Sequence, residues 1–338
     1  MAKYIIKRIL YMLVVLLLLS FLIFAVYNML PVDKAADMAM QEIAANKHLI
    51  YAERYLYWQR RFGLDGNLLT RYFRWLGLAP FYDGSFNGLL QGNLGTSVTY
   101  GKPVAAVIKT PLLNTVLLNL FATALALGIT IPLGVFCATK KGSKRDLAVQ
   151  VGTIVGYSLP VFITAILFIW LFSVQLNLFP VSGMSSVGKE YTGFRAFLDK
   201  LYHFALPLLV MTFCSLGGMT RYVRASMLDA LRLDCVRTAR AKGLEENAVV
   251  WTHAWRNALI PVLSLIVGWL VGIFSGSIMI ENIFGINGIG KVYFDALTAN
   301  DNEIVLAMQM FYILLALVGN LLVDVTYGLA DPRIRVDK

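Results

Sequence analysis

Long apolar stretches alternate with short polar blocks along the whole chain. Six stretches contain no Asp, Glu, Lys or Arg and are long enough for a membrane-crossing helix, which needs roughly 20 residues. They cover residues 9–30, 112–139, 147–176, 201–220, 257–280 and 304–323. The pattern predicts an all-α membrane protein with six transmembrane helices. The composition agrees, because 58% of the residues are hydrophobic, only 15% are charged and the mean hydropathy is +0.67.

The first stretch begins like a secretion signal, because Lys3, Lys7 and Arg8 precede it. The apolar run then extends over residues 9–30, whereas the apolar region of a signal peptide has only about 7–15 residues. A small-x-small cleavage site is also missing before the polar residues that follow Pro31. We therefore expect the first helix to remain uncleaved.

The distribution of Lys and Arg predicts the orientation. With both termini in the cytoplasm, seventeen basic residues fall on the cytoplasmic side, including Arg333, Arg335 and Lys338, and the two shorter outer loops hold four. The long first outer loop holds nine, but long loops are largely exempt from the positive-inside rule. The net charge of +10 thus reflects membrane orientation, and nucleic-acid binding is not expected.

The spans divide the chain into three predicted parts. Residues 1–30 form the cytoplasmic N-terminus and first helix, residues 31–111 form a large extracytoplasmic loop region, and residues 112–338 form a five-helix core. Within the loop region, residues 35–63 have helical composition, and Ile50, Leu56, Tyr57 and Phe62 suit one face of an interfacial helix. Residues 78–104 are rich in Gly and turn formers and predict loops. The region suits a lid over the outer mouth, and direct contact with a substrate or partner is the alternative.

Glycines and prolines mark special points within the apolar stretches. Gly268, Gly272 and Gly276 recur every fourth residue, so on a continuous helix they share one face that another helix can approach closely. A moving helix interface would use the same residues. Gly152 and Gly156 form a shorter version of this spacing. Prolines at positions 132, 160, 207 and 261 remove backbone donors and predict kinks.

Several chemical functions lack the residues they need. Residues 285–292, GINGIGKV, nearly match the phosphate-binding pattern G-x-x-x-x-G-K-[ST], but Val292 stands where a hydroxyl must hold Mg²⁺ and no buried strand precedes it. We expect a tight turn there instead. Glu281, Glu303 and Asp324 fall at the ends of apolar stretches, so a proton or ion relay inside the membrane is not indicated. Three cysteines without a C-x-x-C pair support neither a disulfide framework nor a zinc site.

The segment at about 221–257 concentrates polar residues between two apolar stretches. Residues 232–242 favour a helix, and Gly243 is the residue type that ends a helix in a left-handed conformation. Glu245 and Glu246 suit the first turn of a second helix, because the helix dipole favours negative charge there. The spacing therefore predicts a helix–glycine–helix element on the cytoplasmic face. From spacing alone, an amphipathic connector on lipid headgroups and a docking surface for a protein are equally supported.

The residues in and around this segment resemble a known family. DCVRTARAKGLEENAVVWTHAWRNALIPV is similar to the cytoplasmic EAA loop of permeases in binding-protein-dependent ABC transporters, and specifically of their dipeptide/oligopeptide branch. FGLDGNLLTRYFRWL, GNLGTS, GYSLPVF, FPVSGM and NLLVDVTYGLADPRIR resemble further family motifs in the expected order. Cys235 stands where the family usually has Tyr, and Asn287 replaces a usual Pro.

This resemblance implies the fold of a type I ABC importer permease in a prokaryotic cell membrane. It implies a second homologous permease subunit, two ATP-binding ABC subunits, an extracytoplasmic solute-binding protein and membrane lipid as partners. ATP and Mg would bind to the partner subunits, so no cofactor and no catalytic residue is expected in this chain. The segment at 221–257 would couple transport to ATP hydrolysis. Its expected interface residues are Arg237, Ala239, Arg240, Lys242, Gly243, Leu244 and Glu245.

The resemblance makes di- and oligopeptides the expected solutes, with oligosaccharides, nickel chelates or other small solutes as alternatives. An ion-coupled secondary transporter would need charges within the spans or an internal repeat, and the sequence shows neither. A membrane-embedded enzyme would need a cluster of chemically active side chains. The histidines are instead spread over three loops or loop edges, as His48, His203 and His253.

Overall fold

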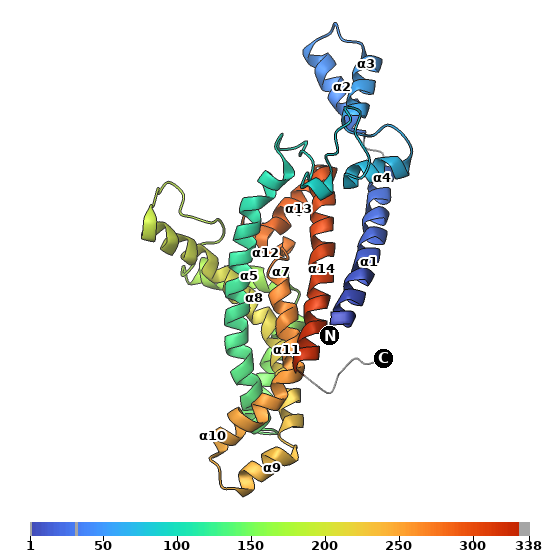
Figure 1. Cartoon of the computed structure of the whole chain (residues 1–338). Coiled ribbons are helices and arrows are strands. Elements are labelled where there is room, and N and C mark those ends of the chain that lie inside the picture. Colours follow the sequence, from blue (N-terminus) through green and yellow to red (C-terminus); the bar gives the residue numbers. More distant parts are fainter. Residues whose placement is uncertain (1, 31–32, 331–338) are drawn as a thin grey trace. The chain divides into compact units, whose positions relative to one another are not determined.

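The computed structural model describes residues 2–30 and 33–330, and side chains within 5–30 and 33–326. Pro31, Arg333, Arg335 and Lys338 therefore lie outside the described residues. All regular elements of the described part are helical, apart from one isolated bridge between Thr96 and Pro103. The chain forms two compact units (Figure 1). Unit 1 comprises residues 1–5, 110–292 and 315–338, and unit 2 comprises residues 6–109 and 293–314.

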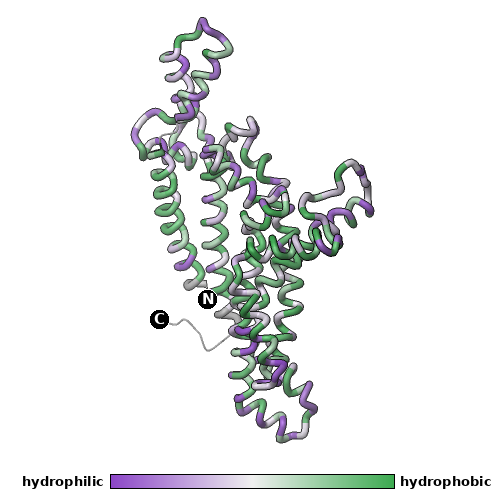
Figure 2. Tube along the Cα trace, turned by 180° about the vertical axis from the view of Figure 1, so that it is seen from behind, coloured by the Kyte–Doolittle hydropathy of each residue, from purple (hydrophilic) through white to green (hydrophobic). Residues whose placement is uncertain are grey.

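Five of the six predicted membrane helices are found as single helices. These segments are long and apolar enough to span a membrane: Ile5–Met29, Val104–Thr139, Gly193–Ala230, Glu246–Gly272 and Asn302–Thr326. The sixth predicted span is a bent pair of helices, α6 (Lys144–Ser158) and α7 (Val161–Phe168), the second continued by the π-helix η2 (Ile169–Gln175), and this geometry is that of a broken span or a re-entrant loop. Figure 2 shows apolar residues along these helices. The cytoplasmic placement of both termini stays a prediction.

A sharp break at Pro160 divides the sixth span. The two halves are bent by 104°. Leu159 is extended, with φ −79° and ψ 132°, because the ring of a following proline disfavours the helical conformation. The kink predicted at Pro160 is thus confirmed, whereas Pro132, Pro207 and Pro261 lie inside continuous helices.

Close helix contacts hold unit 1 together. Its main helices are α5 (Val104–Thr139), α6, α8 (Gly193–Ala230) and α11 (Trp255–Gly272). A Cβ atom added to Gly134 of α5 would lie 2.6 Å from the Val223 side chain, and one added to Gly217 of α8 would lie 2.4 Å from the Thr153 carbonyl oxygen. The absence of a side chain at these two positions lets α8 approach both α5 and α6.

Unit 2 contains α1 (Ala2–Met29) from Ile6 onward, the loop region that follows it, and residues 293–314. The short helix α4 (Leu68–Leu76) begins at Asn67, whose side chain accepts a bond from the Thr70 amide, and ends at Gly77 in the left-handed conformation. Its buried Tyr72 and Leu76 pack against Phe24 of α1. The Tyr72 hydroxyl also lies 2.7 Å from the Ser20 hydroxyl. This small aromatic core fixes α4 against the membrane helix.

The helical composition of residues 35–63 is realised as two helices. Helices α2 (Lys34–Ala45) and α3 (Tyr51–Arg61) pack as a hairpin with a turn between them. The Asp33 carboxylate accepts bonds from the Ala35 and Ala36 amides and caps α2. The Arg54 guanidinium of α3 donates two hydrogen bonds to the Glu42 carboxylate of α2. The loop predicted for residues 78–104 is found, with one helical turn, η1 (Leu89–Gln91).

The remaining short helices belong to the two ends of the core. Helices α9 (Asp234–Ala241) and α10 (Glu246–Ala248) lead through the π-helix η3 (Val249–Ala254) into α11. Helices α12 (Ile278–Ile283) and α13 (Ile289–Thr298) follow α11 and precede α14 (Asn302–Ala330). In Figure 1, α9 and α10 lie at one end of α8 and α11, and α12 follows the opposite end of α11.

The ion pair in the α2–α3 hairpin predicts an acid-sensitive element. Hydrogen bonding to Arg54 holds the pKa of Glu42 below its ordinary value of 4.5. A lowered pKa means that the pair stabilises the hairpin above that ordinary value and that this contribution is lost as the pH falls through the lowered pKa. Hydrogen exchange of residues 34–61 should show less protection in Glu42→Gln than in the wild type at neutral pH, and the difference should shrink as the pH falls below 4.5. Glu53→Gln is the matched control, and a pH-independent difference would contradict the prediction.

Candidate functional site

The segment between α8 and α11 forms a helix–glycine–helix element, as predicted. Helix α9 ends at Ala241, and Gly243 turns the chain with φ +74°, a conformation that residues with a Cβ rarely adopt. The chain then re-enters a helix at Glu246 and runs through η3 into α11. Glu245 precedes this helix in an extended conformation with ψ 138°. The short helix α9 is therefore connected to a membrane helix at each end.

A buried apolar cluster fixes α9 to the helices of unit 1. Val236 and Ala239 of α9 pack with Val249 and Ala254 of η3 in this cluster. The neighbouring helices contribute Val135 and Ala138 of α5, Met219, Val223, Met227 and Ala230 of α8, and Ala258 and Val262 of α11. Ala239 is only 4% exposed, so this residue packs inside its own chain rather than standing on the outer surface expected from the sequence.

The opposite face of α9 and the turn after it are exposed. Six of the predicted interface residues are exposed: Arg237, Arg240, Lys242, Gly243, Leu244 and Glu245. The Arg237 guanidinium pairs with the Asp234 carboxylate of the same helix at 3.4 Å. The Arg240 guanidinium donates bonds of 2.7 and 3.1 Å to the Glu246 carboxylate on the far side of the glycine turn. The turn thus presents basic groups and the apolar Leu244 side chain, which is 45% exposed.

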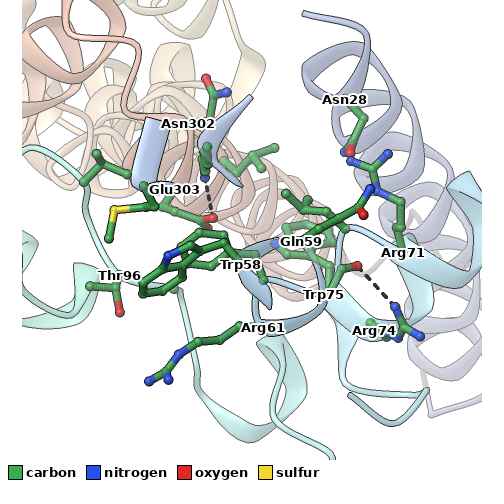
Figure 3. Close-up of a pocket in the computed structure, with 18 of the residues that line it drawn as sticks. Asn28, Trp58, Gln59, Arg61, Arg71, Arg74, Trp75, Thr96, Asn302 and Glu303 are labelled. Atoms are coloured by element: carbon green, nitrogen blue, oxygen red, sulfur yellow. Dashed lines mark hydrogen bonds and ion pairs between the residues drawn. The ribbon is translucent and has the colours of Figure 1, made fainter. Parts of the chain in front are cut away.

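A second candidate site is a cavity of about 1010 Å³ within unit 2. Its wall is formed by α1, α2, α3, α4, the loop after α4 and the first residues of α14. Figure 3 shows Trp58, Gln59 and Trp75 between Glu303 on one side and Arg71 on the other. The Lys34 ammonium pairs with Glu303, and the Arg74 guanidinium pairs with Asp65 at 2.7 Å.

Comparison with known proteins assigns the family. Residues 130–336 match the family described as "Binding-protein-dependent transport system inner membrane component", and residues 1–119 match the N-terminal part of such components. The chain belongs to this family of transporter membrane components. Its multiple apolar helices agree with a multi-pass membrane protein.

Named relatives match nearly the whole chain. The chain is 35% identical over 335 residues to the oligopeptide transport system permease protein AppB of Bacillus subtilis, covering 99% of both chains. It is 35% identical to the di/tripeptide transport system permease protein DppB of Pseudomonas aeruginosa, covering 94% of both. It is 33% identical to the dipeptide transport system permease protein DppB of Escherichia coli, covering 95% of both. A solved structure of the MetNI methionine ABC transporter aligns with a TM-score of 0.49 and 16% identity. The alignment covers 65% of this chain and 96% of that chain.

The predicted glycine face is only partly realised in this transporter component. Helix α11 ends at Gly272, so Gly276 lies beyond the helix and does not share a face with Gly268 and Gly272. A Cβ on Gly276 would lie 2.3 Å from the Gly290 nitrogen, whereas one on Gly268 or Gly272 would meet no atom of the described chain within 4 Å. Gly276 therefore serves close packing of the backbone after the break. Helix packing at Gly268 and Gly272 stays a prediction, and its partner is to be sought in another chain.

The segment after α11 is held by polar side chains of α5. The Asn119 amide donates to the carbonyl oxygens of Ile273 and Ser275 at 2.9 and 2.8 Å, which satisfies acceptors released where α11 ends. Glu281 of α12 is only 1% exposed. Its carboxylate accepts bonds of 2.8 Å from the Thr115 hydroxyl and from the Lys291 amide.

The near match to a phosphate-binding loop is explained by this buried carboxylate. The amide of Lys291 faces Glu281 of the same chain, so an amide that would cradle a phosphate in such a loop already has an anionic partner. Added Cβ atoms on Gly288 and Gly290 would lie within 2.3 and 3.0 Å of the Glu281 side chain. The glycines are therefore required by close approach to the carboxylate, and the tight turn expected there is found.

An ion pair between α8 and α6 was not anticipated from the sequence. The Arg224 guanidinium of α8 donates bonds of 2.9 and 2.8 Å to the two oxygens of Asp146, near the start of α6. The Asp146 side chain is 2% exposed and also accepts from the Gly142 amide and the Gln150 side chain. Both residues lie within charge-rich blocks of the sequence, so no periodic signal distinguishes them from surface charges.

Removal of this pair should destabilise the protein. Asp146→Ala leaves the half-buried Arg224 guanidinium without its anion and should lower the free energy of unfolding by roughly 1–3 kcal/mol. The double variant Asp146→Ala/Arg224→Leu should lose less than the sum of the single variants, because the two groups interact directly. Denaturant unfolding in detergent measures both effects. Asp234→Ala is the matched control, since the exposed Asp234–Arg237 pair contributes little, and equal losses in the two single Asp variants would contradict the prediction.

Proposed function

We propose that this chain is the permease subunit of an ATP-driven importer of di- and oligopeptides, in which it forms half of the translocation pathway. The observation that carries the proposal is the match over nearly the whole chain to relatives named as oligopeptide and dipeptide permeases. The candidate membrane spans supply the apolar helices that such a pathway requires. Oligosaccharides, nickel chelates and other small solutes remain the alternative cargo of the same architecture.

The complete importer is proposed to contain further subunits. A second homologous permease would complete the pathway, two ABC subunits would hydrolyse ATP, and an extracytoplasmic solute-binding protein would deliver the peptide. Gly268 and Gly272 of α11 have open space beside them, which suits close approach by a helix of the second permease. The Lys and Arg bias of the loops supports cytoplasmic termini, and α9 is proposed to lie on the same side as the ATPases.

Helix α9 and its glycine turn are proposed to dock on an ATPase subunit. Arg237, Lys242 and Leu244 are exposed and offer the combination of basic and apolar groups that a protein surface can recognise. Ala239 would support the docking surface indirectly, because it packs α9 against α5 and α8. Arg240 is paired with Glu246 and thereby braces the turn. A displacement of α9 by the ATPase would reach α8 and α11 through the same packing.

The permease chain is proposed to be non-catalytic. Its role would be to form a passage and to change shape, without making or breaking a covalent bond. ATP and Mg would bind to the partner ABC subunits, and no cofactor would be held by this chain. Peptide selectivity would lie mainly in the solute-binding protein, so binding measurements on that partner are the most direct test of the solute class.

The docking role predicts a specific transport defect. The double variant Arg237→Glu/Leu244→Asp reverses one exposed charge and adds another without touching the buried cluster, so the subunit should fold and reach the membrane. ATP-driven peptide uptake into proteoliposomes should fall by at least about tenfold, because the loss of one good contact costs about 1.4 kcal/mol or more. Co-purification of the ATPase subunits should fall in parallel.

Lys189→Glu serves as the control for this experiment. Lys189 is exposed in a predicted outer loop, and the same charge change there should leave uptake and ATPase recovery unchanged. Full uptake in the α9 variant would exclude the docking role, while absence of peptide uptake by the wild-type importer would exclude the peptide assignment.

A further inference from the structure

The cavity of unit 2 has the size and lining of a small-molecule site. Its volume of about 1010 Å³ lies at the upper end of the roughly 300–1,000 Å³ typical of ligand pockets. Indole rings of Trp58 and Trp75 form part of the wall, and polar groups project beside them (Figure 3). All residues of this wall belong to unit 2.

Arg71 of α4 stands out among the charged groups of the wall. The cavity's Lys34 and Glu303 neutralise one another, and Arg74 is occupied by Asp65. Arg61 also lines the wall, where its guanidinium donates to the Tyr57 hydroxyl and lies over the Trp58 ring. The buried Nε atom of Arg71, in contrast, has no hydrogen-bond partner among the described residues. Buried polar groups are nearly always satisfied, and Nε is one of the donors with which a guanidinium binds a carboxylate in bidentate fashion. The missing partner of Arg71 therefore has the chemistry of an anion.

A carboxylate of the same wall complements this cation. Asp33 caps α2 and accepts a bond of 2.9 Å from the Tyr55 hydroxyl, and it has no cationic partner among the described residues. Both charges act on Tyr55, because hydrogen bonding to Asp33 is the main cause that raises the pKa of the Tyr55 hydroxyl, while the Arg71 guanidinium opposes that rise. The cavity thus holds the cation of Arg71 and the carboxylate of Asp33 near a common side chain, and neither group forms an ion pair among the described residues.

We infer that this cavity is an accessory binding site for short zwitterionic peptides, with the terminal carboxylate on Arg71, the terminal ammonium near Asp33 and the side chains against Trp58 and Trp75. The inference rests on the proposed function, from which it takes the peptide as the zwitterion present. A free anion is disfavoured, because Asp33 would oppose it. The site lies in the first loop region and the first turn of α14, and it would hold peptide independently of the solute-binding protein.

The experiment uses the assembled complex of permease and ATPase subunits in nanodiscs, without the solute-binding protein. Calorimetric titration compares the tripeptide Ala-Phe-Ala with its C-terminal amide. The free acid should bind at least about tenfold more tightly, because a charged bidentate hydrogen bond is worth about 1.5–3 kcal/mol. Arg71→Gln should weaken binding of the acid by a similar factor and leave the amide unchanged. Equal affinity for acid and amide in the wild type would overturn the inference.

Two further variants separate the site from general damage. Arg195→Gln changes an exposed arginine in the first turn of α8 in unit 1 and should leave both affinities unchanged. Gln59→Trp narrows the cavity without altering a charge and should weaken acid and amide alike. Unchanged binding in Gln59→Trp would overturn the inference, even where the Arg71 variant fails to assemble.

Glycerophosphoethanolamine is the competing probe, because a lipid headgroup also carries an anion and an ammonium. Tighter binding of this compound than of the tripeptide would overturn the peptide assignment in favour of lipid. Peptide uptake is then measured after the solute-binding protein has been added back. This measurement distinguishes failure of the accessory site from failure of the proposed function. Normal uptake without binding in the receptor-free complex would reject the accessory site alone, whereas absent uptake would reject the proposed function.

Discussion

The packing of small apolar side chains beneath α9 is the constraint on which the proposed coupling depends. Val236 and Ala239 of α9 share one buried cluster with residues of α5, α8, η3 and α11. Protein interiors are close-packed and leave little space into which a side chain can yield. A shift of α9 must therefore move the helices packed on it or disrupt their contacts, while its exposed basic groups and Leu244 stay available to a partner. One face of α9 thus packs against the other helices of unit 1, and the opposite face is the proposed docking surface.

Polar groups within the helical core follow a related rule, because backbone and charge buried away from water need partners from the protein. Asn119 satisfies carbonyl oxygens released at the end of α11, and backbone amides and Thr115 surround the Glu281 carboxylate. The Asp146–Arg224 pair similarly ties α6 to α8. The bonds of Asn119 and Glu281 allow the chain to leave the regular helix after α11 while the backbone groups they contact remain hydrogen-bonded.

The two units carry different kinds of site. Unit 1 contains the α9 element with its buried support, and the proposed coupling role requires that support to be rigid. Unit 2 contains a cavity in which Arg71 and Asp33 lie beside aromatic rings and form no ion pair among the described residues. The buried Nε atom of Arg71 is costly to leave without a partner, and a zwitterion would satisfy it while also supplying a cation to the exposed Asp33. The structure thus combines the α9 element, which is suited to docking on another protein, with a cavity suited to binding a small solute.

The sequence by itself determined the membrane class, five single membrane helices and the helix–glycine–helix element, because long uncharged runs and the glycine at position 243 act locally and leave a pattern along the chain. It also indicated the family, since motifs in order need no geometry. Only the tertiary structure decided that Ala239 faces inward, that Gly276 leaves the helix and that Asp146 meets Arg224. These outcomes depend on pairing between segments distant in sequence. The same holds for the cavity around Arg71, whose wall combines the first loop region with α14.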